Sequence, residues 1–396
     1  MISEKMIKLA AGNSAIRAMF EEGKRLAAEY GRENVYDFSL GNPNFPAPAE
    51  VNQAIKDTLD TMESTVVHGY MSNAGFEAVR GTVADSINRR FGTAFAAKNI
   101  RMTVGAAGGL NVILKTLLNP GDEVLTFAPY FVEYGNYVGN YDGVLKAVPA
   151  DAETFQPDAE KLAAAVTPKT KAVIINNPNN PTGVVYSEET VKKLAAALEA
   201  KQRELGTSIY LISDEPYREL AYDGVDVPYL TKYYRNTVVD YSWSKSLSLP
   251  GERIGYLVIP DEIDEAELIM NAAAIANRML GFVNAPSLMQ LAVAKCIDCK
   301  VDIEGYDANR KLLYNGLTEL GFECAKPEGA FYLWLRSPEA DEKEFVSRGK
   351  KYNILMVPGS SFAWPGYVRL AYCVSGEMIK RSLPAFAKLG AEYGLK

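Results

Sequence analysis

Between about Asn99 and Pro260, short runs of nearly continuous apolar residues alternate with segments whose apolar residues recur at helical spacing. Runs without polar interruption are typical of strands that are buried on both faces of a sheet. Alternation of such strands with helices predicts a largely parallel sheet covered by helices, which is the α/β fold class. The expected strands are VLTFAP (124–129), KAVIINNP (171–178), SIYLISDEP (208–216), TVVDYSWS (237–244) and GYLVIP (255–260).

Two expected helices carry clear end signals. The opening helix is expected to start at Asn13 or Ser14 and to end at Gly31, because Asn and Ser are favoured N-caps and Gly is a favoured C-cap. A second helix is expected between Ser187 and Gly206, with two glutamates after the serine that interact favourably with the helix dipole. Its position between two apolar runs is the one that a crossover helix of a parallel sheet would occupy.

The pattern changes near Asn284, where a long helical stretch begins and is followed by the apolar runs FYLWLR (331–336) and YVRLAY (367–372). This change indicates a second, smaller domain of the α+β class, completed by the N-terminal helix. We therefore expect a large domain of residues 46–284, and a small domain made of residues 1–45 and 285–396.

Composition narrows the functional classes. The 396 residues carry 42 basic and 49 acidic side chains, a net charge of −7 with histidine counted as neutral. This acidic balance argues against a nucleic-acid-binding surface, which needs clustered Lys and Arg. No apolar run approaches the roughly 18 residues of a membrane span, and the N-terminus lacks the apolar core of a signal peptide. We expect a cytoplasmic protein whose partners are neither nucleic acids nor membranes.

The chain has a single histidine, His68, which argues against histidine-based metal sites and catalytic triads. One histidine cannot build a multi-histidine metal site, and a Ser-His or Cys-His arrangement would depend on that residue alone. Cys296 and Cys299 form a CxxC without a second pair, so we expect ordinary thiols and no metal site. If the protein is an enzyme, Lys, Tyr or Asp side chains or a cofactor must transfer its protons.

Three polar clusters follow apolar runs directly, at 176–183 (NNPNNPTG), 214–217 (DEPY) and 242–245 (SWSK). In open α/β sheets, ligands bind beyond the carboxyl ends of the strands. Because those ends share one edge of a parallel sheet, the three clusters predict one ligand site.

Lys245 is the central candidate for chemistry. A lysine that follows a buried strand among small residues has a lowered pKa, so its amine can act as a nucleophile. Asp214 could hold a protonated ring nitrogen, and Tyr217 could donate to a phenolic oxygen, with Asn180 as a further polar group. Each of these residues, taken alone, also fits a surface, cap, packing or turn position.

A phosphate site is suggested by TVGAAGGL (103–110), which opens an apolar helix. Small residues there would let an anion approach the free N–H groups of the first turn, although close packing explains the glycines equally well. Arg253 could contact the same phosphate through two N–H groups, and Ser242 and Ser244 could add hydroxyl donors. Phe131 could stack on a flat ring, although core packing also explains it.

Together these positions resemble the pyridoxal-phosphate-dependent aminotransferases of class I and II, fold type I, over nearly the whole chain. The most specific motifs are NNPTG (179–183), DEPY, and S-x-S-K followed by R-x-G eight residues after the lysine. The resemblance implies a large domain with a mostly parallel seven-stranded sheet and a smaller α+β domain. It also implies pyridoxal 5′-phosphate as cofactor, and a homodimer whose active sites are shared at the interface.

The resemblance assigns a role to each candidate residue. Lys245 matches the lysine that binds the cofactor covalently and carries the proton, Asp214 the partner of the ring nitrogen, and Tyr217 and Asn180 the donors to the 3′ oxygen. The phosphate site comprises Ala106, Ala107, Ser242, Ser244 and Arg253, and Phe131 is the stacking residue. Arg369 matches the arginine that binds the substrate α-carboxylate, with Gly41 beside it. Tyr70 matches the tyrosine that reaches the neighbouring subunit's phosphate.

One departure concerns the segment after Phe131, where some relatives have a histidine and this chain has Glu133 and Tyr134. Any hydrogen-bond support for Asp214 must therefore come from another group. Arg278 stands where dicarboxylate-specific relatives have an arginine that reaches across the dimer. It implies aspartate or another dicarboxylic amino acid as substrate, although an exposed helix position explains it equally well.

Two other functions fit the same sequence. A carbon–sulfur β-lyase would use the same fold and cofactor, and would release pyruvate from cystathionine instead of transferring an amino group. A non-catalytic regulator would need an attached DNA-binding domain, and we expect none, because the opening helix is expected to begin near residue 13. We expect a ping-pong aminotransferase.

Overall fold

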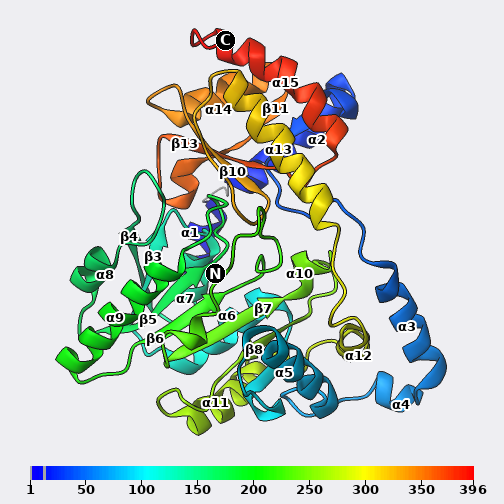
Figure 1. Ribbon diagram of the computed structural model, residues 1–396, viewed down its shortest axis with the longest axis vertical. Coiled ribbons are helices and arrows are strands. Elements are labelled where there is room, and N and C mark those ends of the chain that lie inside the picture. Colours follow the sequence, from blue (N-terminus) through cyan, green and yellow to red (C-terminus); the bar gives the residue numbers. More distant parts are fainter. Residues whose placement is uncertain (1, 12–14) are drawn as a thin grey trace.

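The computed structural model describes residues 2–11 and 15–396 and has a seven-stranded sheet at its centre (Figure 1). The strand order is β2-β8-β7-β6-β5-β3-β4, and every neighbouring pair is parallel except the two that involve β8. The mostly parallel seven-stranded sheet implied by the sequence is confirmed. The strands are β2 (Ile100–Thr103), β3 (Glu123–Ala128), β4 (Val144–Pro149), β5 (Thr170–Asn176), β6 (Tyr210–Asp214), β7 (Thr237–Ser242) and β8 (Gly255–Val258).

Helices cover both faces of this sheet, which explains the continuous apolar runs. On β5, Ile174 packs in the cluster of α6 and α11, whereas Val173 and Ile175 pack on the opposite side with α8 and α9. Helix α9 lies between its N-cap Ser187 and its C-cap Gly206, as predicted. The helices of this part are α3 (Ala49–Thr61), α4 (Ser64–Val67), α5 (Glu77–Phe91), α6 (Gly105–Leu117), α7 (Glu133–Gly139), α8 (Ala159–Ala165), α9 (Glu188–Leu205), α10 (Trp243–Ser246), α11 (Ala266–Met279) and α12 (Ser287–Lys295).

A second group of elements lies at the top of Figure 1 and has its own hydrophobic core. Four short antiparallel strands follow the order β12-β13-β10-β9, and β1 pairs with β11 in parallel. This mixture agrees with the expected α+β part. Its strands are β1 (Tyr36–Asp37), β9 (Cys324–Ala325), β10 (Tyr332–Arg336), β11 (Ile354–Leu355), β12 (Val357–Pro358) and β13 (Tyr367–Ala371). Its helices are α2 (Ala15–Tyr30), α13 (Ile303–Glu319), α14 (Glu342–Lys351) and α15 (Gly376–Ala391).

The structure tests only part of two sequence predictions, the opening helix and the domain boundaries. The opening helix ends at Tyr30, one residue before the expected Gly31, whereas its proposed N-caps, Asn13 and Ser14, lie outside the described residues. A separate helix, α1 (Glu4–Ala11), precedes it and was not predicted. The division into 46–284 against 1–45 and 285–396 stays a proposal, and α12, just after residue 284, packs against α3 and α5.

The cysteines are free thiols, with Cys296 buried and Cys299 half-buried. Among the described residues, no cluster of three or more His, Cys, Asp and Glu side chains could hold a metal ion. No helix in the described ranges combines the length and the apolar character needed to cross a membrane.

Candidate active site

A cavity of about 330 Å³ lies at the carboxyl ends of β5, β6 and β7, where the sheet meets β10 and β13. All of the site residues predicted from the sequence line this cavity, except Tyr70 and Arg278. The predicted residues in its wall are Gly41, Ala106, Ala107, Phe131, Asn180, Asp214, Tyr217, Ser242, Ser244, Lys245, Arg253 and Arg369. The three polar clusters therefore meet at one edge of the sheet, as the strand pattern predicts.

Lys245 lies in the short helix α10, directly after β7. Its Nζ donates a hydrogen bond to the carbonyl oxygen of Gly41 at 2.8 Å. Burial lowers the pKa of Lys245 to about 8, and the positive charges of Arg369 and Arg253 act in the same direction. About one tenth of the amine is therefore unprotonated at pH 7, which is the form that reacts as a nucleophile or base and is far scarcer for an ordinary lysine.

Asp214 is the last residue of β6, and its side chain is buried. Its Oδ2 accepts a hydrogen bond from the Tyr134 hydroxyl at 2.5 Å, whereas its Oδ1 has no hydrogen-bond partner among the described residues. Burial raises the pKa of Asp214 to about 7, and donation from Tyr134 opposes that rise. Tyr134 is thus the group that supports Asp214 by a hydrogen bond, and Oδ1 faces no donor among the described residues.

Asparagine side chains fix the turn that follows β5. The Asn176 side chain donates to the backbone carbonyl of Asp214 at 3.0 Å and accepts from the Asn180 N–H at 2.7 Å. Asn180 Oδ1 accepts from Arg369 at 3.1 Å, which leaves the Asn180 amide N–H groups as donors at the cavity. The first residue of the NNPNNPTG cluster therefore positions the candidate donor four residues later.

The N-terminus of α6 and Arg253 form a cationic end of the cavity. Gly105 has φ +77°, a conformation that favours glycine, and a Cβ built there would lie 2.9 Å from an Arg253 nitrogen. Arg253 itself has φ +53°, an uncommon conformation for a non-glycine residue that often marks a functional site. Free backbone N–H groups, the helix dipole and the guanidinium together suit a phosphate group.

Arg369 reaches the cavity from β13 and is 2% exposed. One of its terminal nitrogens donates to the carbonyl of Ser39 at 2.7 Å, and its Nε has no partner among the described residues. The guanidinium lies 4.5 Å from the ring centre of Tyr332. A buried arginine with a free N–H group is an expected site for a carboxylate.

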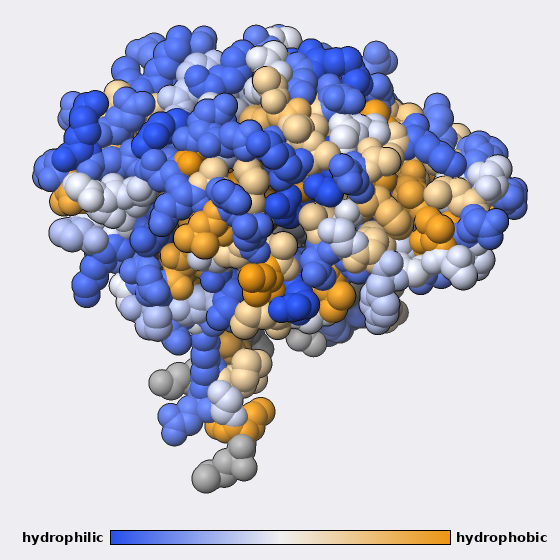
Figure 2. Space-filling view, turned by 90° about the horizontal axis from the view of Figure 1, so that it is seen from below, coloured by the Kyte–Doolittle hydropathy of each residue, from blue (hydrophilic) through white to orange (hydrophobic). Residues whose placement is uncertain are grey.

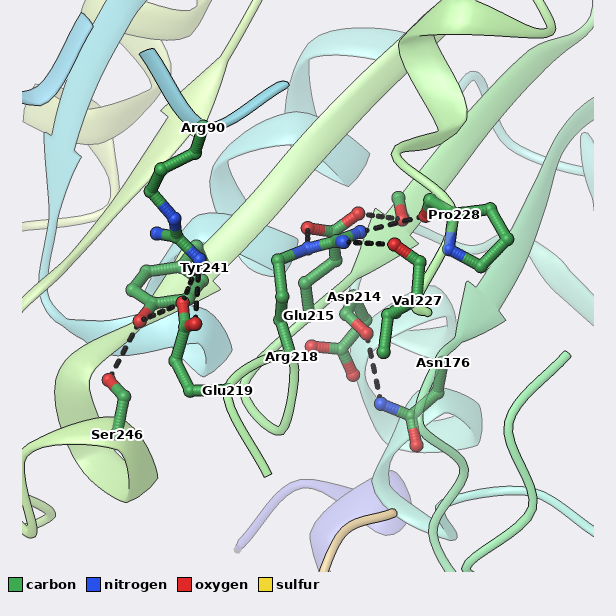
Figure 3. A network of polar contacts seen from close by, with 11 residues as sticks. Arg90, Asn176, Asp214, Glu215, Arg218, Glu219, Val227, Pro228, Tyr241 and Ser246 are labelled. Atoms are coloured by element: carbon green, nitrogen blue, oxygen red, sulfur yellow. Dashed lines mark hydrogen bonds and ion pairs between the residues drawn. The ribbon is translucent and has the colours of Figure 1, made fainter. Parts of the chain in front are cut away.

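A polar network, buried around Arg218 and Glu215 and exposed at Arg90, holds the loop after β6 and the turn that carries Lys245 (Figure 3). Arg218 forms an ion pair with Glu215 and donates to two backbone carbonyls at 2.8 and 3.0 Å. A second chain of contacts runs from Arg90 through Glu219 and Tyr241 to Ser246. Because Ser246 follows Lys245 directly, these contacts restrain the backbone beside Lys245.

Sequence reasoning missed four polar residues at the site. Three of them, Tyr137, Asn176 and Tyr332, line the cavity. The fourth, Tyr134, does not line it but donates a hydrogen bond to Asp214. Asn176 belongs to a polar cluster that was recognised, so its position was a usable signal. Tyr332 is inside the apolar run FYLWLR, where its sequence neighbours indicate only a buried strand.

Tyr70 and Arg278 do not line the cavity of their own chain. Tyr70 is 93% exposed, and Arg278 is exposed at the end of α11. The segments that carry them are joined, because Asn73 donates to the Val283 carbonyl at 3.0 Å and Asn284 donates to the Ser72 carbonyl at 2.8 Å. The two side chains therefore belong to neighbouring segments of one exposed region.

Comparison with known proteins agrees with this geometry. The family model "Aminotransferase class I and II" matches residues 33–386. The aspartate/prephenate aminotransferase of Thermus thermophilus is 31% identical over 92% of this chain and 93% of its own length. The structure of an aminotransferase from Eubacterium rectale has a TM-score of 0.97 and 48% identity, covering 99% of each chain. The aspartate aminotransferase of Thermus thermophilus with maleate has a TM-score of 0.86 and 29% identity, covering 98% of this chain and all of that one.

The names of these relatives favour amino transfer over the carbon–sulfur lyase reaction that the sequence left open. The chain therefore belongs to the class I and II aminotransferases, a family of pyridoxal-phosphate-dependent enzymes, and it is an aminotransferase.

Proposed function

We propose that this chain binds pyridoxal 5′-phosphate in the cavity and transfers amino groups between a dicarboxylic L-amino acid and a 2-oxo acid. The observation that carries the proposal is the buried Asp214 Oδ1, which has no partner among the described residues and lies in the same cavity as Lys245. A protonated ring nitrogen would satisfy this oxygen, because a buried carboxylate favours the charged form of a cation beside it. The N-terminus of α6 with Arg253 would hold the phosphate, and Tyr217 and Asn180 the phenolic oxygen.

When bound, the cofactor supplies a carbonyl carbon that accepts amino groups and a pyridinium ring that accepts an electron pair. The chain's own residues then have separate tasks. Arg369 and the backbone of Gly41 would bind the substrate α-carboxylate, which orients the Cα–H bond. Lys245 Nζ, once free, would remove the α-proton, and its lowered pKa suits it to act both as base and as acid near neutral pH.

We further propose a homodimer in which Tyr70 and Arg278 act at the partner's site. Exposed large apolar side chains occur on α11, which ends beside Arg278, and near Tyr70 in the chain, including Val66, Ile275 and Met279. Figure 2 shows apolar patches among the polar side chains of the face seen from below. Apolar surface of this kind, beside charged residues that do not reach their own site, is expected of an isologous interface.

Arg278 carries the substrate proposal. In the described part of this chain, the only cationic side chains in the cavity wall are Lys245, Arg253 and Arg369, and each already has a proposed role. A distal carboxylate would need another cation, and the partner's Arg278 would supply it. Relatives named as aspartate or aspartate/prephenate aminotransferases support a dicarboxylic substrate at about 30% identity.

Arg278→Ala is expected to lower the aspartate-to-alanine ratio of kcat/KM by roughly 100- to 1,000-fold, because a carboxylate would lose its ion-pair partner in a desolvated site. The measurement is a panel of amino donors against 2-oxoglutarate with purified wild type and variant. Arg381→Ala, at an exposed position on α15, is the control and should keep the ratio. An unchanged ratio in Arg278→Ala would refute the dicarboxylate assignment.

Mixing two defective variants tests the shared site. Chains with Lys245→Ala and chains with Arg278→Ala should regain about one quarter of wild-type aspartate activity when unfolded and refolded together, because half of randomly paired dimers then hold one complete site. The control pair, Lys245→Ala with Arg369→Ala, alters two residues of the same cavity and should regain none. Recovery in neither pair, with dimers present by light scattering, would contradict action across the interface.

A further inference from the structure

Tyr332, on β10, connects two groups of the cavity that have different tasks. Its hydroxyl lies 2.9 Å from the hydroxyl of Tyr217, on the cofactor side. Its ring lies 4.5 Å from the guanidinium carbon of Arg369, on the carboxylate side. Tyr332 is only 2% exposed, so both contacts are made in a dry environment, where polar interactions are strong.

The same hydroxyl also packs against the Gly41 backbone. A Cβ built on Gly41 would lie 2.0 Å from the Tyr332 oxygen, so only glycine can occupy this position. The Gly41 carbonyl in turn accepts from Lys245 at 2.8 Å. Tyr332 thus touches both of the groups proposed to bind the α-carboxylate, Arg369 and Gly41.

The tyrosine pair must share its hydrogens in a particular way. Burial raises the pKa of Tyr332 to about 12 and that of Tyr217 well above its ordinary value, so both hydroxyls keep their hydrogens near neutral pH. Only one hydrogen can lie between the two oxygens. If Tyr332 donates it, the Tyr217 hydrogen is free to point into the cavity.

We propose that Tyr332 is a positioning residue: it donates to Tyr217, so that the Tyr217 hydroxyl is directed at the phenolic oxygen of the cofactor, and its ring supports Arg369 under the substrate carboxylate. This inference rests on the proposed function and extends it. Through its two contacts, Tyr332 would align the cofactor with the residues that bind the substrate carboxylate.

Tyr332→Phe keeps the ring and removes the hydroxyl. We expect the midpoint of the pH titration of the bound cofactor's visible absorbance to move to higher pH. This corresponds to a proton dissociation constant that is about 3- to 10-fold smaller. The midpoint rises because a weaker hydrogen bond from Tyr217 stabilises the unprotonated form of the cofactor's phenolic oxygen less. The KM for amino donors should stay within about twofold, because the ring still supports Arg369.

A double-mutant cycle with Tyr217→Phe isolates the coupling. In the Tyr217→Phe background, Tyr332→Phe should cause no further shift of the midpoint, because the hydroxyl it directs is gone. Tyr332→Leu, or Tyr332→Met if the leucine variant does not fold, removes the ring as well. That change should raise the KM of all amino donors by about tenfold, as expected for loss of a buried cation–π contact.

Tyr222→Phe is the matched control. Tyr222 is also buried, and its hydroxyl donates to the Ala330 carbonyl at 2.5 Å, but it does not line the cavity. This control should lower the unfolding temperature without moving the absorbance midpoint or the KM. An unmoved midpoint in Tyr332→Phe, or shifts that add fully in the double variant, would overturn the proposal. Absence of a visible band in the wild type supplied with pyridoxal 5′-phosphate would instead overturn the proposed cofactor.

Discussion

Replacing Lys245 with alanine is expected to abolish amino transfer, lowering kcat by at least about 10⁴-fold. Lys245 is the only lysine in the cavity wall among the described residues, so no other amine there can attach the cofactor or carry the α-proton. The variant should still fold, because Lys245 makes one side-chain hydrogen bond, to Gly41, and removal of a buried amine relieves its desolvation.

Two measurements check this result without relying on turnover. Borohydride treatment of the wild type supplied with pyridoxal 5′-phosphate should leave the cofactor covalently attached to the peptide that contains Lys245, as read by mass spectrometry, and Lys245→Ala should show no attachment. Lys193→Ala, at an exposed position on α9, is the control and should behave as wild type. Covalent attachment at another lysine in the Lys245→Ala protein would contradict the assignment.

The lowered pKa of Lys245 gives the same reaction a pH dependence. Only the unprotonated amine attacks, and its fraction rises with pH until the pKa of about 8 is passed. The rate of cofactor capture by the cofactor-free protein should therefore rise roughly tenfold per pH unit below pH 8 and level off above it. A lysine with an ordinary pKa would give a rise that continues beyond pH 9.

Asp214→Asn should have the second-largest effect, lowering kcat by roughly 10²- to 10³-fold or more, because an amide cannot stabilise a protonated ring nitrogen as a buried carboxylate does. The same change should stabilise the cofactor-free protein at alkaline pH. Burial raises the pKa of Asp214 to about 7 in the folded state, so the folded chain binds more protons than the unfolded chain between about pH 4 and pH 7. Stability is therefore lost as pH rises through this window.

The folded-state pKa of Asp214 of about 7 lies well above its ordinary value of about 4. Complete ionisation therefore lowers the free energy of unfolding by about 4 kcal/mol, and about 3 kcal/mol of this loss falls between pH 5 and pH 8. Urea unfolding of cofactor-free wild type and Asp214→Asn at both pH values measures it. Asp85→Asn, at an exposed position on α5, should show no such gain. A gain for Asp214→Asn that is the same at pH 5 and pH 8 would mean that Asp214 does not titrate in this window.

These opposite effects share one physical origin. The Asp214 carboxyl group is held in a desolvated position, and its Oδ1 has no hydrogen-bond partner among the described residues. A carboxylate held in this way is costly to ionise, and a cation bound beside it would offset that cost. Such preorganisation is a general property of catalytic sites, where groups are held for the transition state and not for the stability of the empty protein.

The sequence determined the elements whose physics is local. Strands β3, β5, β6, β7 and β8 were predicted because burial on both faces leaves a continuous apolar run. Strand β4 (Val144–Pro149) was not, because it is an edge strand with several exposed positions and no such run. The polar clusters were recognised for a related reason, since each follows a strand directly and parallel strands end at one edge.

Only the tertiary structure decided which side chains meet. Tyr134 reaches Asp214 across 80 positions of sequence, and Tyr332 reaches Tyr217 across 115. Hydrophobic periodicity reports which face of an element is buried, but not which distant hydroxyl it will face, because that depends on how separate elements pack. The exposure of Tyr70 and Arg278 is likewise a property of the folded surface. The sequence thus determined the family and the edge of the sheet where chemistry occurs, and packing between distant elements decided how its carboxylate, lysine and arginine are held.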